Sequence, residues 1–145
     1  MTEARNSEEE LFPVSLSSPG AGSGLLTYTC IGPSMFPTIK PGDVIVVYPY
    51  GALPVRRGDV IVFRLPGGER VISHRVVKVR GNRLTVRGDN NSLEDPWGLS
   101  REDVVGLVTR RERRGRTRSL AGGPVGALLG GISRAAAMAR LTLFR

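Results

Sequence analysis

Six short apolar runs follow one another between residues 25 and 110, separated by glycine, proline, asparagine and charged residues. The runs cover residues 25–31, 43–48, 59–65, 69–79, 83–88 and 103–110. They are rich in valine and isoleucine, which favour strands, and no helical pattern lies between them. Gly81-Asn82 suits a tight hairpin turn between the fourth and fifth runs. The spacing predicts a mainly β domain, antiparallel or mixed, that coils on itself.

The two ends of the chain differ from this β region. Residues 1–24 are polar and then rich in serine, proline and glycine, which predicts a disordered arm. The last residues, 124–145, have a helical period that predicts an amphipathic helix, lying either on a membrane surface or on the β domain. Its apolar face would carry Val125, Leu128, Leu129, Ile132, Ala136, Ala139 and Leu143. The predicted organisation is an arm (1–24), a β domain (25–110), an arginine-rich linker (111–123) and the helix (124–145).

Positive charge is concentrated in one segment. The chain has 21 basic and 13 acidic residues, a formal net charge of +8, and residues 110–118 contain six arginines and one glutamate. Such a block indicates an anionic partner, either a phospholipid surface or nucleic acid, or else a solvated charged linker. Nucleic acid is the less favoured partner, because the first 24 residues contain no helix-turn-helix pattern and no aromatic residue interrupts the arginines.

Cys30 and His74 are the only cysteine and histidine, which excludes an intrachain disulfide, a cysteine metal cluster and a multi-histidine metal site. We therefore expect no metal and no cofactor. No segment reaches the roughly 20 uninterrupted apolar residues that a spanning helix needs. The acidic N-terminus also lacks the layout of a signal peptide. These features predict a peripheral membrane or cytoplasmic location.

Ser34 lies in the segment "IGPSMFPTIKPGD" (31–43), which is stiffened by three prolines. A serine in such a turn is usually a turn residue, and it becomes a nucleophile only beside a base. His74 lies in the run 69–79, where strict alternation would place Val76 and Lys78 on its face. It is either a buried core residue or a base.

Residues 87–98, "RGDNNSLEDPWG", follow the fifth run and contain two aspartates, Asp89 and Asp95. One interpretation is a loop held by its own side-chain hydrogen bonds. The other is that one carboxylate orients the imidazole of His74, as in a serine–histidine–aspartate arrangement.

Four motifs in this order resemble those of the type I signal peptidases. They are "GPSMFPTIKPGD" (32–43), "RRGDVIVFRL" (56–65), "SHRVVKV" (73–79) and "RGDNNSLED" (87–95). A histidine in the third motif, where most bacterial members have lysine, is similar to the endoplasmic-reticulum and archaeal type. One departure is Pro33, which stands where the family usually has glycine before the serine.

The resemblance implies a coiled β fold shared with repressor-type self-cleaving proteases. It implies Ser34 as nucleophile, His74 as general base, and Asp95 as the orienting acid, with Asp89 as second candidate. The backbone N–H groups of Ser34 and Gly32 would stabilise the oxyanion. The implied substrate is a protein with a signal-peptide-like segment, cleaved after small residues. An imidazole base predicts activity that falls as the pH drops through about 6–7.

Two alternatives stay open, and a third is disfavoured. A regulatory protein of the same fold could bind nucleic acid or an anionic membrane through the arginine block. Self-cleavage could occur in the small residues "SPGAGSG" (18–24). A degenerate, inactive protease is disfavoured, because Ser34, His74 and Asp95 occur together.

Overall fold

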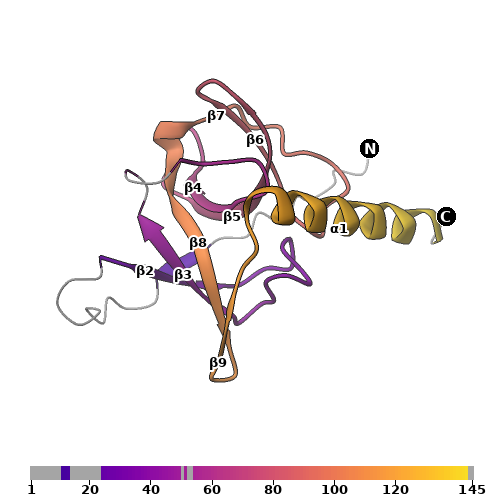
Figure 1. Cartoon of the computed structure of the whole chain (residues 1–145), viewed down its shortest axis with the longest axis horizontal. Helices are drawn as coiled ribbons and strands as arrows, with labels where there is room; N and C mark the ends of the chain where they lie inside the picture. The colour runs from indigo at the N-terminus through magenta and orange to yellow at the C-terminus, as the bar shows by residue number, and fades with distance from the viewer. Residues whose placement is uncertain (1–10, 14–23, 50, 52–53, 144–145) are drawn as a thin grey trace.

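The computed structural model describes residues 11–13, 24–49, 51 and 54–143. Its strands are β1 (Leu11–Pro13), β2 (Leu26–Cys30), β3 (Val44–Pro49), β4 (Val60–Arg64), β5 (Val71–Arg80), β6 (Arg83–Arg87), β7 (Leu99–Ser100), β8 (Val104–Arg113) and β9 (Arg116–Ser119). A short 3-10 helix, η1 (Arg101–Asp103), precedes β8, and the helix α1 (Gly123–Leu143) follows β9 (Figure 1). The predicted mainly β fold with a C-terminal helix is confirmed.

All pairings between the described strands are antiparallel. The strand order is β1-β2-β3-β8-β4-β5-β6-β7, and β9 pairs with β8. The edge strand β1 also lies against β5, so the sheet coils back on itself as predicted. The two-residue turn at Gly81-Asn82 joins β5 to β6, because Arg80 and Arg83 are directly paired.

The core consists of two clusters that share the central strand β4. Its alternate residues point in opposite directions, so Val60 and Val62 join one cluster while Ile61 and Phe63 join the other. The first cluster also contains Cys30, Met35, Ile39, Ile45, Val47 and Val108. The second contains Val55, Ile72, Val76, Leu84, Val86, Leu99 and Val104. Because the first cluster includes Met35, it fixes the loop that carries Ser34 to the sheet.

The arginine-rich segment is not the predicted linker. β8 continues to Arg113, the chain turns at Arg114 and Gly115 with positive φ, and β9 returns along β8. Arg113 donates two hydrogen bonds to the Asp43 carboxylate, at 2.8 and 2.7 Å. Burial alone would raise the pKa of Asp43, but the bonds from Arg113 and the Lys40 N–H, with the charge of Arg111, hold that pKa below its usual range. A partner distant in sequence thus turns this part of the segment into sheet.

The N-terminal arm was predicted to be disordered, yet residues 11–13 form β1. The free edge of β2 offers unpaired backbone groups, and pairing with them gives this short apolar stretch a regular structure. Residues 1–10 and 14–23 of the arm lie outside the described residues.

The helix α1 contacts the β domain through small residues. A Cβ atom on Gly126 would lie 2.2 Å from the Gly58 carbonyl oxygen, and one on Gly130 would lie 2.7 Å from Arg75 Cδ. Ala137 is buried on the same side. The close approach therefore depends on the absence of larger side chains at these positions.

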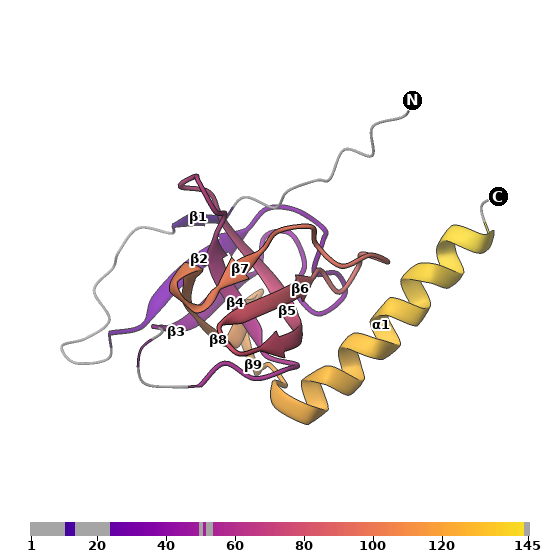
Figure 2. The ribbon, with the colours of Figure 1, turned by 90° about the horizontal axis from the view of Figure 1, so that it is seen from above.

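The large apolar residues of α1 face solvent. Val125, Leu128 and Ile132 are 60%, 66% and 58% exposed. The helix does pack on the β domain, which was one of the two alternatives, but its glycine face makes that contact instead of the predicted apolar face. Figure 2 shows α1 running beside the β domain, with its last turns extending past the strands. None of the helices in the described ranges combines the length and hydrophobicity needed to cross a membrane.

Candidate active site

The loop between β2 and β3 positions Ser34, and hydrogen bonds close the loop at its base. Cys30 N–H donates to the Asp43 carbonyl at 2.9 Å, and Gly42 N–H donates to the Cys30 carbonyl at 2.7 Å. Within the loop, Phe36 N–H donates to the Pro33 carbonyl at 3.0 Å. Gly32 lies in this loop just before Pro33. The serine therefore sits on a turn that is held at its base and packed against the core through Met35.

Ser34 and His74 lie within hydrogen-bonding distance of each other. The distance from Ser34 Oγ to His74 Nε2 is 2.8 Å, and the two residues are 5% and 3% exposed. The other ring nitrogen of His74, Nδ1, contacts Asp95 Oδ2. Asp95 comes from the loop between β6 and β7, where its N–H donates to the Val86 carbonyl at 2.9 Å. A hydroxyl, an imidazole and a carboxylate from three separate segments therefore form one chain of contacts.

Two aromatic rings surround the imidazole. Trp97 lies nearly parallel to His74, with ring centroids 6.2 Å apart and planes inclined by 27°. Phe63 of β4 meets the imidazole edge-on at 6.1 Å. These rings restrict the orientations open to His74 and exclude water from around it. His74 is therefore both buried, as the core interpretation required, and in contact with Ser34.

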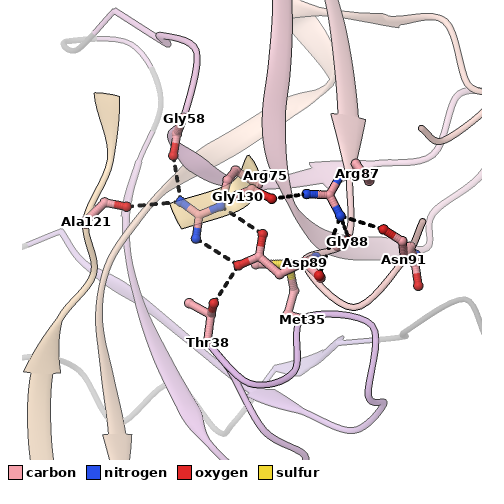
Figure 3. A network of polar contacts seen from close by, with 10 residues as sticks. All are labelled: Met35, Thr38, Gly58, Arg75, Arg87, Gly88, Asp89, Asn91, Ala121 and Gly130. Carbon is pink, nitrogen blue, oxygen red and sulfur yellow. Dashed lines mark hydrogen bonds and ion pairs between the residues drawn. The ribbon is translucent and has the colours of Figure 1, made fainter. Parts of the chain in front are cut away.

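Asp89 does not contact His74 in this arrangement. Its carboxylate receives two hydrogen bonds from Arg75, each 2.8 Å long, and one from Thr38 Oγ1 at 2.5 Å (Figure 3). The side chains of Arg75 and Asp89 are 2% and 0% exposed, so this is a buried ion pair. Of the two candidate acids, Asp95 contacts the imidazole of His74, and Asp89 contacts the guanidinium of the next residue, Arg75.

A second buried arginine joins this loop to α1. Arg87 Nη1 donates to the Asn91 carbonyl and Nη2 donates to the Gly130 carbonyl of α1, both at 2.5 Å (Figure 3). Burial lowers the pKa of the Arg87 guanidinium, while the Asp89 carboxylate acts to raise it. Farther along α1, Arg140 donates to Asn90 Oδ1 at 2.7 Å. The helix is thus connected at two points to the loop that carries both aspartates.

The same loop supports the backbone of the serine turn. Asn90 N–H donates to the Ser34 carbonyl at 2.8 Å, and Asn90 Nδ2 donates to the Pro33 carbonyl at 3.2 Å. A Cβ atom on Gly88 would lie 2.6 Å from the Ser34 carbonyl oxygen and 3.1 Å from His74 Nε2. Only glycine at this position leaves the two groups room to approach each other.

Strict alternation predicted that Lys78 shares the face of His74, and this prediction is wrong. A β-bulge between Val76 and Lys78 shifts the register, so Val79 packs against the core while Lys78 is exposed. Its ammonium lies 3.1 Å from Glu94 Oε1 at the surface. His74 is thus the base candidate that β5 presents to Ser34.

Sequence reasoning missed five residues that surround the site, namely Thr38, Phe63, Arg75, Arg87 and Trp97. The signal available for the arginines was their position next to valines in strands that alternate polar with apolar residues, where a buried charge needs a partner. Among the described residues, no group of histidine, cysteine, aspartate or glutamate side chains could hold a metal ion.

Comparison with known proteins places the chain in a family. The model of the Peptidase S24-like family matches residues 2–108. The signal peptidase complex catalytic subunit SEC11C of Homo sapiens is 33% identical over 86 residues, covering 50% of this chain and 44% of the relative. For the signal peptidase complex catalytic subunit sec11 of Pyrenophora tritici-repentis, the identity is 34% over 88 residues, covering 52% and 50%. The chain thus spans about half the length of these curated relatives. These relatives are signal peptidase catalytic subunits, in agreement with the resemblance that the four motifs indicated. The chain itself belongs to the Peptidase S24-like family.

Proposed function

We propose that this chain is a serine endopeptidase that cleaves signal-peptide-like segments with Ser34 as nucleophile. The observation that carries the proposal is the 2.8 Å contact between Ser34 Oγ and His74 Nε2, with Asp95 on the opposite ring nitrogen. A serine hydroxyl needs an adjacent base to become an effective nucleophile, and a base needs a third group to orient it. The three residues meet both requirements.

In the proposed reaction, His74 Nδ1–H donates a hydrogen bond to the Asp95 carboxylate, which leaves Nε2 free to accept the Ser34 proton. Ser34 Oγ attacks the scissile carbonyl, and the backbone N–H groups of Ser34 and Gly32 donate to the developing oxyanion. The imidazolium then protonates the leaving amine, and an acyl-enzyme forms. A water molecule that loses its proton to His74 releases the product and restores the serine.

The substrate class is inferred from the relatives, which are catalytic subunits of signal peptidase complexes. We propose that this chain accepts an extended polypeptide with small residues at the first and third positions before the scissile bond. The partner in this reaction is therefore a protein or peptide, and the proposed chemistry requires no cofactor.

Peptide cleavage tests this proposal. The substrate is a signal-peptide-like peptide with alanine at both specificity positions, and the matched peptide has leucine next to the scissile bond. We expect wild-type protein to cleave only the first peptide, after the alanine, and Ser34→Ala to cleave neither. Cleavage of both peptides at equal rates, or cleavage that persists in Ser34→Ala, would refute it.

We also propose that α1 binds an anionic membrane surface, because the exposed apolar face of α1 lies on the same helix as Arg134 and Arg140. Exposed leucine and isoleucine side chains on a helix gain free energy by entering the interface, while arginines interact with anionic headgroups. The arginines of the β8–β9 hairpin would add to this attraction at low salt.

Removing the apolar face should weaken vesicle binding without changing the charge. We expect the double variant Leu128→Gln, Ile132→Gln to bind phosphatidylglycerol-containing vesicles at least about 100-fold more weakly, since burying each of the two side chains contributes about 1.5–3 kcal/mol. Met138→Gln is the matched control, because Met138 is 51% exposed on another side of the helix. Vesicle sedimentation measures binding, and an equal loss in both variants would argue against the assigned face.

A further inference from the structure

The edge of β2 that does not face β3 leads directly to the serine loop. Because Cys30 N–H donates toward β3, the backbone groups of the preceding residue, Thr29, face the opposite side. An edge with unpaired N–H and C=O groups accepts another extended chain by strand addition. A polypeptide that presents a bond to Ser34 in an extended conformation would run along this edge.

Residues 11–13 already occupy that edge. β1 pairs antiparallel with β2, with Leu11 opposite Cys30, Phe12 opposite Thr29 and Pro13 opposite Tyr28. β1 also lies against β5, the strand that carries His74 (Figure 2). The segment therefore lies between the strand that leads to the nucleophile and the strand that carries the base.

We propose that β1 is an intramolecular occupant of the substrate's strand-binding site, which an extended substrate must displace before it reaches Ser34. This inference rests on the proposed peptidase function, and it adds that the N-terminal segment of the same chain competes with substrate. The described residues of β1 pair with residues 28–30, which precede Ser34 in the sequence. None of them is paired with Ser34 itself. The segment blocks the site without presenting a described peptide bond to the nucleophile.

The geometry also keeps the occupant displaceable. β1 contains only three residues, and an isolated strand of this length is held weakly. By the alternation of an antiparallel ladder, Phe12 and Thr29 form the hydrogen-bonded pair. Pro13 lacks an N–H group, which an edge strand tolerates at a position that does not donate to its neighbour. The pairing of β1 with the edge of β2 therefore depends mainly on the backbone groups of Phe12.

Replacing Phe12 by proline tests the proposal, since proline removes the N–H that faces Thr29. We expect Phe12→Pro to lower KM for the alanine-containing peptide at least about threefold while kcat stays unchanged, because the free site becomes more populated. Pro13→Ala, which adds an N–H at a position that does not face β2, should behave like wild type. Amide hydrogen exchange at Thr29 should become faster in Phe12→Pro only, and faster exchange with an unchanged KM would overturn the proposal.

A binding measurement separates this inference from the peptidase assignment. In a Ser34→Ala background, the labelled alanine peptide should bind more tightly to the Phe12→Pro protein, as measured by fluorescence anisotropy. This readout needs no turnover, so it answers the question even if wild-type protein hydrolyses nothing. Equal peptide affinity with and without Phe12→Pro would overturn the occupancy of the site by β1, whatever the catalytic result.

Discussion

Asp95→Asn should lower kcat by about 10³- to 10⁴-fold while KM and the free energy of unfolding change little. Asparagine preserves the shape of the side chain, but it offers a neutral amide where the carboxylate contacts His74 Nδ1. The imidazole then loses both the acceptor that selects its useful tautomer and the negative charge that stabilises the imidazolium. Steady-state cleavage of the alanine peptide measures the effect.

Glu94→Gln is the matched control for this variant. Glu94 is the adjacent acidic residue in the same loop, and it contacts the exposed ammonium of Lys78 rather than His74. A surface pair of this kind contributes little, so kcat and stability should both stay near wild type. If Asp95→Asn retained kcat, or if Glu94→Gln lost it equally, the assignment of Asp95 as the orienting acid would be wrong.

Asp89→Asn should act on folding rather than on the chemical step. It leaves the Arg75 guanidinium buried without its carboxylate partner, and breaking a buried ion pair in this way costs about 3–5 kcal/mol. We expect urea denaturation to show this loss in the free energy of unfolding. The protein that remains folded should keep a kcat within about tenfold of wild type, because Asp89 does not contact the imidazole.

The double variant Asp89→Leu, Arg75→Met provides the second arm of this test. Replacing both charges by apolar side chains removes the unpaired charge, so we expect it to be more stable than Asp89→Asn. The carbonyls of Gly58 and Ala121 would still lose their donor, so recovery should be incomplete. Normal stability with a large loss of kcat in Asp89→Asn would instead place Asp89 in the chemistry.

The strands were predictable because their signal is local. Valine-rich runs and turn residues determine where each strand begins and ends, and they placed β2 to β6 and β8 approximately where the structure has them. The four ordered motifs indicated Ser34, His74 and Asp95, with Asp89 as the second candidate acid. The structure adds that side chains from three segments meet, which no single motif specifies.

The remaining features depend on partners that are distant in sequence. The separation of Asp89 from His74 depends on Arg75, which binds the Asp89 carboxylate and also donates to the carbonyls of Gly58 and Ala121. The arginine block becomes a hairpin with an ion pair to Asp43, and a bulge in β5 shifts Lys78 away from His74.

The sequence pattern also could not predict which side of α1 faces the β domain. A helical projection finds the apolar side of a helix, but it does not decide whether that side packs on the domain or faces outward. Here the glycines at positions 126 and 130 permit a closer contact than leucine could, so the glycine side faces the domain. Close backbone contact between α1 and the β domain determines which side of the helix faces the domain. A hydropathy pattern contains no information about such a contact.

Covalent labelling with a serine-reactive fluorophosphonate probe tests whether Ser34 is an activated nucleophile. Intact-mass analysis would compare wild type, Ser34→Ala and His74→Ala, with peptide mapping to locate the adduct. We expect a single adduct on Ser34 in wild type, none in Ser34→Ala, and strongly slowed labelling in His74→Ala. A folded wild-type protein that acquires no adduct, or an adduct that persists in Ser34→Ala, would contradict it.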